Sequence, residues 1–120
     1  MNRIRVLLAT LPPLVSGLLT HLIQGQTDME VVDAVSQPVQ LLLAVKDTRA
    51  QVVIVPLPGS GEIPGICSHL LAEFPDLLIL ALSITGEAGF IYTAERVVEA
   101  PVNNILKSIR LAGKREDFYP

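Results

Sequence analysis

The sequence predicts a three-layer α/β domain, in which helices cover both faces of an open, mainly parallel sheet of about five strands. Three observations lead to this prediction. Short apolar runs alternate along the chain with segments whose apolar residues recur every three or four positions. Several runs are apolar without interruption, which is typical of strands buried on both faces of a parallel sheet. The 120 residues, of which 50% are hydrophobic and 18% charged, suffice for one core.

The first two thirds of the chain alternate regularly between expected strands and helices. The first helix begins at Pro13, which suits a first helical turn, and ends at Gly25. We expect its apolar residues to form one buried stripe: Leu14, Val15, Leu18, Leu19, Leu22 and Ile23. A first strand is expected at 3–9, and further strands are expected at 29–35, 52–57 and 77–84. A second helix is expected from Pro38 to about Lys46, capped by Ser36, and a third helix over 63–74.

The alternation breaks after Ser83. A turn at 85–89 is followed by aromatic and β-branched segments at 90–93 and 96–99, which suit a strand or a β-hairpin folded back at Ala94-Glu95. Too few residues remain before Pro101 for a full helix. Pro101 begins a last helix that ends at Gly113. The domain is therefore expected to span residues 1–113, with 114–120 as a polar tail and a strand or hairpin in place of a fourth helix.

Composition excludes several classes of function. The net charge of −3, with nine scattered basic residues, predicts no direct contact with nucleic acid. The single cysteine cannot form an internal disulfide, and no Cys/His cluster has the spacing of zinc ligands, so we expect a cytoplasmic protein without metal or cofactor. The apolar run after Arg3 and Arg5 is interrupted by Pro12-Pro13, so export or membrane insertion is not expected.

The framework resembles a response-regulator receiver domain, the flavodoxin-like fold that accepts a phosphoryl group on an aspartate. The resemblance covers residues 3 to about 84 and the helix from 101 to 112. The stretches that carry it are Ile4-Arg5-Val6-Leu7-Leu8, Pro13-Leu14-Val15, Met29-Glu30-Val31-Val32, Gln51-Val52-Val53-Ile54-Val55, Phe74-Pro75-Asp76, Ile79-Leu80-Ala81-Leu82-Ser83 and Pro101. It implies a flavodoxin-like fold and a role in bacterial signalling.

The chemistry of that family is largely missing from this chain. Receivers carry carboxylates after the first strand to hold Mg²⁺, an aspartate nucleophile ending the third strand, a hydroxyl after the fourth and a lysine after the fifth. The matching positions hold Thr10 and Leu11, Pro56, and Ser83, and no residue can be matched to the lysine. Because proline has no nucleophile, we expect a non-phosphorylatable protein-interaction domain in signalling or transcriptional regulation, with an unknown signalling protein as partner.

An alternative function is binding of a small molecule in the crevice at the carboxyl ends of the strands. Thr10, Pro56, Ser83 and the loop from Gly59 to Gly61 would line it. These offer hydroxyls but no acid, base or nucleophile, so an enzyme is not expected. Cys67 and His69 stand two apart on a helix and point in different directions, so we expect a buried thiol and a solvated imidazole.

We also expect a homodimer. Losing a helix beside the sheet would uncover apolar strand surface, and an edge strand there would offer backbone groups to a second copy. Phe90 and Tyr92 share one side of an extended strand while Ile91 and Thr93 share the other, so we expect only one pair to face the core. The candidate interface comprises the last helix and the residues Phe90, Ile91, Tyr92, Thr93, Val97 and Val98. Basic residues of that helix, such as Arg110, either favour its C-terminus or bind an acidic partner.

Overall fold

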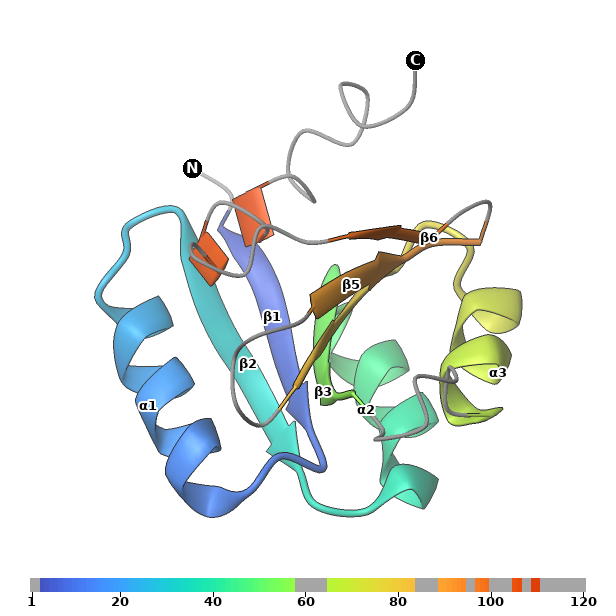
Figure 1. Ribbon diagram of the computed structural model, residues 1–120, viewed down its shortest axis with the longest axis horizontal. Coiled ribbons are helices and arrows are strands. Elements are labelled where there is room, and N and C mark those ends of the chain that lie inside the picture. Colours follow the sequence, from blue (N-terminus) through green and yellow to red (C-terminus); the bar gives the residue numbers. More distant parts are fainter. Residues whose placement is uncertain are drawn as a thin grey trace.

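The computed structural model describes residues 3–57, 65–83, 89–94, 97–99, 105–106 and 109–110, and for 97–99 it describes the backbone only. The loop from Gly59 to Gly61 and the tail 114–120 lie outside these residues. The elements follow in the order β1 (Ile4–Ala9), α1 (Pro13–Gln24), β2 (Met29–Val35), a 3₁₀ turn (Pro38–Gln40), α2 (Leu41–Thr48), β3 (Val52–Pro56), α3 (Gly65–Glu73), β4 (Leu78–Leu82), β5 (Gly89–Tyr92) and β6 (Val97–Glu99) (Figure 1). Residues 105–106 and 109–110 are helical.

The sheet confirms the predicted topology and the predicted hairpin. Its strand order is β2-β1-β3-β4-β5-β6. The first four strands run parallel, whereas β5 pairs antiparallel with β4 and β6 pairs antiparallel with β5. The described sheet has six strands because the hairpin adds two where about one was expected. A strand can return antiparallel after a short turn, whereas a parallel strand needs a crossover of a dozen or more residues.

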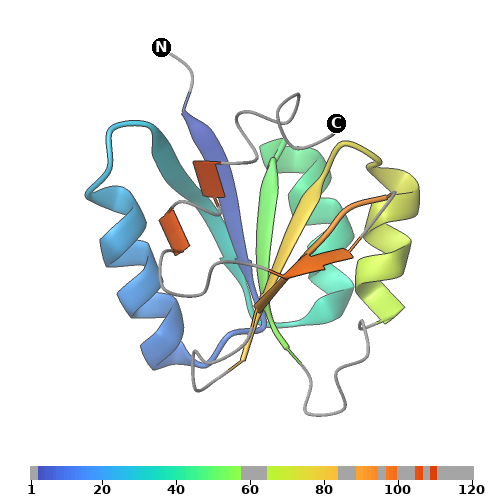
Figure 2. The ribbon, with the colours of Figure 1, turned by 45° about the horizontal axis from the view of Figure 1, so that its top comes forward.

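Helices cover both faces of the sheet, as the sequence predicts. Helix α1 lies on one face, and α2 and α3 lie on the other, which Figure 2 shows from a second direction. On the α1 face, Leu19 and Ile23 pack with Ile54, Leu80 and Ile109. A second cluster fills the α2–α3 face and includes Leu7, Leu41, Val45, Val53, Cys67, Leu70 and Ile79. The fold therefore has three layers with a separate core on each side of the sheet.

The expected apolar stripe of α1 is only half buried. Leu19 and Ile23 are buried against the sheet, but Leu14, Leu18 and Leu22 are 75%, 63% and 43% exposed. Residues four apart share a helix face, and neighbouring positions differ by about 100° around the axis. The row of Leu14, Leu18 and Leu22 and the row of Val15, Leu19 and Ile23 therefore do not both face the sheet, and the expectation of one buried stripe was wrong.

Strand β5 is buried on both faces, which corrects the expectation that only one pair of its side chains faces the core. Ile91 is 1% exposed and packs in the α1-side cluster, whereas Tyr92 is 5% exposed and packs in the other cluster. Thr93 is also buried, and Phe90 is partly exposed. Side chains on both faces of β5 therefore pack in a core, and Ile109 of the last helix belongs to the cluster that contains Ile91.

The start of α2 also differs from the expectation. Ser36 is not its cap, because a 3₁₀ turn at Pro38–Gln40 precedes the α-helix and Gln37 flanks that turn without a side-chain hydrogen bond to it. The helix runs to Thr48, two residues beyond Lys46, and Arg49 ends it in the left-handed conformation with φ 56°. Short 3₁₀ turns are common at helix N-termini, and proline suits a first turn, where its missing N–H is not needed.

Arg110 ties the last helix to the loop before β2. Its Nε donates to Asp28 at 2.7 Å, and its guanidinium also donates to Gln26 at 2.9 Å. The hydrogen bond from Arg110 lowers the pKa of the Asp28 carboxyl. This side chain therefore serves the fold of its own chain, which is neither of the two roles considered from the sequence. None of the helices in the described part of the chain is both long and apolar enough to cross a membrane.

Candidate functional site

A cavity opens at the carboxyl ends of β1 and β3, where the two strands separate. Their pairing extends from Val6 to Leu8 on β1 and ends at Ile54 on β3. Beyond it, the Thr10 N–H donates to the Val35 carbonyl of β2 at 2.8 Å, while β3 continues along β4. Thr10 has a φ of 55°, which is unusual for a β-branched residue and turns the chain away from β3. Pro56, which has no N–H to donate, ends β3.

The cavity has a volume of about 210 Å³ and is lined mainly by apolar side chains. The lining residues are Thr10, Pro38, Leu41, Val55, Pro56, Leu57, Ile66 and Cys67. The Thr10 hydroxyl and the Cys67 thiol are the polar side-chain groups of this lining. A space of this kind accepts a small, mostly apolar group and offers little to an anion.

Two of the four predicted pocket residues meet here. Thr10 and Pro56 both line the cavity. Leu11 instead packs against the cluster on the α1 face of the sheet, on the other side from the cavity. Ser83 directly follows β4 and is partly exposed, but it is not among the residues that line this cavity.

Sequence reasoning missed that Leu41, Val55 and Cys67 line the cavity with Thr10 and Pro56. The position of Val55 could have been predicted, because it stands two residues after Val53 and side chains two apart on a strand point to the same face of the sheet. Cys67 was expected on the buried stripe of its helix, and the strand order then places that stripe near the end of β3. The position of Leu41 depends on the 3₁₀ turn before α2, which no pattern in the sequence indicated.

The expectations for Cys67 and His69 are confirmed. Cys67 is fully buried, whereas His69 is exposed on the same helix. Burial raises the pKa of the Cys67 thiol to about 11. A thiol of this kind is protonated at neutral pH and does not act as a nucleophile.

The residues of the cavity do not fit Mg²⁺, the ion that the receiver resemblance implies. Mg²⁺ prefers oxygen ligands and is usually held in proteins by one or two carboxylates. Among the described residues, the lining of the cavity contains no carboxylate, and Thr10 supplies the one side-chain oxygen. Within the described ranges, no group of three or more His, Cys, Asp or Glu residues is placed to hold a metal.

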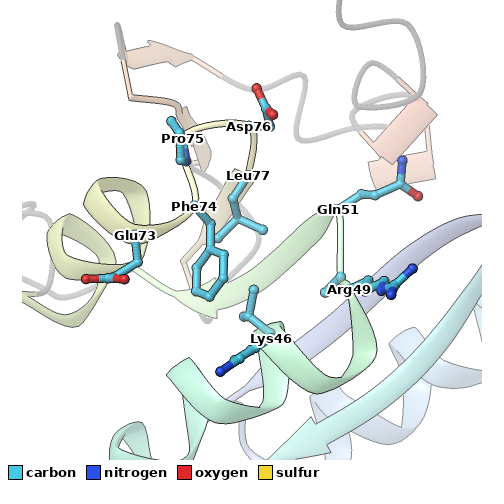
Figure 3. Close-up of a pocket in the computed structure, with 10 residues that line it drawn as sticks. Lys46, Arg49, Gln51, Glu73, Phe74, Pro75, Asp76 and Leu77 are labelled. Atoms are coloured by element: carbon cyan, nitrogen blue, oxygen red, sulfur yellow. The ribbon is translucent and has the colours of Figure 1, made fainter.

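A second cavity, of about 380 Å³, lies at the opposite end of the sheet, between the ends of α2 and α3. Figure 3 shows the Phe74 ring pointing into it above Lys46, while the carboxylates of Glu73 and Asp76 point away. The charged groups here do not converge on a common point, as they would around a specific polar ligand. This cavity therefore does not suggest a chemical activity.

Comparison with known proteins finds similarity in structure. No family model and no curated protein matches the chain. A structure of the Salmonella typhimurium RcsB response regulator, studied for its conformational dynamism in DNA interaction, has 22% identity and a TM-score of 0.58, over 70% of this chain and 44% of that chain. A structure of the RcsB–DNA complex has 22% identity and a TM-score of 0.59, with coverages of 71% and 44%. The response regulator domain of Thermotoga maritima CheB has 19% identity and a TM-score of 0.54, with coverages of 68% and 61%.

These similarities establish the fold. The chain has the flavodoxin-like fold of a response-regulator receiver domain. It differs from the receiver pattern in one respect, because β5 is the next element after β4 and runs antiparallel to it. The chain spans less than half the length of the RcsB chains it matches. DNA interaction is a property described for RcsB.

Proposed function

We propose that this chain is a receiver-like protein-interaction domain that accepts no phosphoryl group and has no catalytic role. It acts in bacterial signalling or transcriptional regulation, in the cytoplasm, through an unidentified signalling protein. The receiver-like fold supports the signalling part of this proposal. Fold alone does not fix function, so the proposal depends on the chemistry of the strand-end cavity.

The observation that carries the proposal is the apolar lining at the end of β3. Phosphoryl transfer to a protein needs a nucleophile and a cation that neutralises the charge of the phosphoryl group. Pro56 supplies no nucleophile, and the described residues that line its cavity include no carboxylate for a cation. A receiver-like surface can then still bind a partner, but its state is not switched by phosphorylation at this position.

The first prediction is that the protein is not phosphorylated by acetyl phosphate in the presence of Mg²⁺. The intact mass, measured by mass spectrometry after incubation, is expected to stay that of the unmodified 13.0 kDa chain. The response regulator domain of CheB, treated in parallel, serves as a positive control. A mass increase of one phosphoryl group that is removed by hydroxylamine or by alkali would contradict the proposal, because it would show an acyl phosphate.

A second candidate function is binding of a small neutral molecule, and the 210 Å³ cavity favours it. Its apolar lining and single hydroxyl suit a compact, mostly apolar ligand. Thermal-shift measurements with a panel of neutral metabolites separate this candidate from the first, because a ligand that binds only the native state raises its stability.

The homodimer stays a prediction, and the structure limits which of the expected residues can lie in its interface. Ile91, Tyr92 and Thr93 are buried in their own chain and offer no exposed surface. β6, which contains Val97 and Val98, is the edge strand on this side of the sheet, so its outer backbone groups could pair with a second copy. Light scattering is expected to give twice the chain mass of 13.0 kDa at micromolar concentrations. A mass of one chain throughout that range would refute the dimer.

A further inference from the structure

A groove between the edge strand β2 and helix α2 combines exposed apolar side chains with two carboxylates. It has a volume of about 490 Å³ and lies on the opposite side of α2 from the cavity of Figure 3. Val39 and Leu43 are 79% and 62% exposed in it. Asp33 and Asp47 are exposed in the same groove, one on the strand and one on the helix. The other lining residues are Ala34, Val35, Gln40 and Ala44.

A β-bulge places Asp33 in this groove. The register between β1 and β2 shifts after Val6, so that Val6 pairs with Val31 but Leu7 pairs with Asp33. Val31 packs on the α1 face, and a regular strand would return Asp33 to that face. The extra residue, Val32, puts Asp33 beside Leu7 on the α2 face instead. Bulges commonly redirect a side chain in this way near binding sites.

The charges of the groove define the kind of partner that fits. No basic residue is among the groove-lining residues in the described part of the chain. Two copies of this chain meeting here would bring four carboxylates together, which disfavours self-association through this face. A segment with an aliphatic side chain between two cationic ones would cover Val39 and Leu43 and pair with both aspartates.

The position of β2 in the sheet favours an extended segment. In the described sheet β2 is the outermost strand on its side and pairs with β1, so its outer edge faces away from the sheet. The Ala34 N–H of this strand donates to the Asp33 carboxylate at 2.8 Å. A peptide can add to such an edge as a further strand, with main-chain hydrogen bonds for affinity and side-chain contacts for specificity. Alternate residues of that peptide would then point into the groove.

We propose that the groove between β2 and α2 binds an extended segment of a partner protein in which two cationic side chains flank an aliphatic one at alternate positions. The proposal rests on the proposed function as a protein-interaction domain and names the chemistry of the partner. It does not depend on the strand-end cavity. If the groove binds no peptide, the phosphorylation result is unchanged. If the protein is phosphorylated, the peptide result is unchanged. Failure of this proposal and failure of the proposed function are therefore distinguishable.

A synthetic peptide tests the proposal with the whole 120-residue chain. The probe is acetyl-Arg-Val-Leu-Val-Arg-amide, whose two arginines and central leucine share one face of a strand over about 13 Å. Amide NMR at low salt is expected to show saturable shifts at Ala34 and Leu43. Affinity is expected to fall severalfold at about 0.15 M salt, where the Debye length is about 8 Å. The same peptide with glutamate for arginine is expected not to bind.

Variants then separate the two contributions. The double substitution Asp33→Asn with Asp47→Asn is expected to weaken binding at least tenfold, and Leu43→Ser is expected to abolish the apolar contact and weaken binding similarly. Leu18→Ser is the matched control, because Leu18 is 63% exposed on α1, which covers the other face of the sheet. All four substituted positions are exposed, so the variants are expected to fold, which thermal melts check. Unchanged affinity of the Asn variant, shifts confined to other surfaces, or no binding at millimolar peptide would each overturn the proposal.

Discussion

Replacing Ile91 by Asp is expected to unfold the domain. Ile91 is 1% exposed and packs in the cluster between the sheet and α1. The substitution removes apolar packing, which costs about 2–5 kcal/mol for a truncation of this size, and buries a charge without a partner, which adds several kcal/mol. Together these approach or exceed the 5–15 kcal/mol that stabilises a typical domain. Circular dichroism and a urea titration measure the effect.

The matched control is Leu18→Asp, which introduces the same charge on an exposed helix position. We expect a loss of less than about 1 kcal/mol, since exposed substitutions have small effects and Asp is only a moderately poor helix former. A folded, monodisperse Ile91→Asp protein would show that β5 does not lie in the core. This outcome would also reopen Ile91 as a dimer contact.

The thiol of Cys67 is expected to react on the order of a hundredfold more slowly than a free thiol at pH 8. Burial raises its pKa to about 11, so roughly 0.1% is thiolate at that pH, against about a quarter for a thiol with the ordinary pKa of 8.5. Because its raised pKa means that the native state holds this proton more tightly than the unfolded state does, a rise in pH lowers the stability that the group contributes. Stability from this group is present below about pH 9 and is lost towards pH 11.

A coloured thiol reagent measures this protection, with His69→Cys as the control. His69 is exposed on the same helix, so the introduced thiol should react at the rate of a free one while Cys67 does not. We expect unfolding in urea to raise the reaction rate of Cys67 to that of a free thiol. Equal rates for the two thiols in the native protein would contradict the burial of Cys67.

Much of the fold could be predicted because its signals are local. The uninterrupted apolar runs at β3 and β4 mark strands that are covered on both faces, and both strands are buried in the structure. The hairpin of β5 and β6 could be predicted from two local features, the β-branched and aromatic residues after Gly89 and the short distance to Pro101. The sequence also indicated that Thr10 and Pro56 approach each other, because the carboxyl ends of neighbouring parallel strands meet at one edge.

The remaining features depend on contacts between distant residues. Both rows of α1 are apolar, so only the packing of α1 on the sheet decides that Leu19 is buried and Leu18 exposed. The burial of both faces of β5 depends on how far the helices extend over the sheet. Asp33 reaches the groove through a bulge whose one sequence signal is the pair Val31-Val32, which interrupts strict alternation. No local pattern brings Asp47 to the same place.

The most direct test of the central claim is an amide NMR titration with Mg²⁺ followed by beryllofluoride, which mimics a phosphoryl group on an aspartate. The central claim is that the strand-end cavity of Thr10 and Pro56 takes neither Mg²⁺ nor a phosphoryl group. The resonances of Thr10, Val55 and Leu57, which line that cavity, are expected to remain unchanged throughout the titration. Saturable, Mg²⁺-dependent shifts at these three residues would contradict the claim.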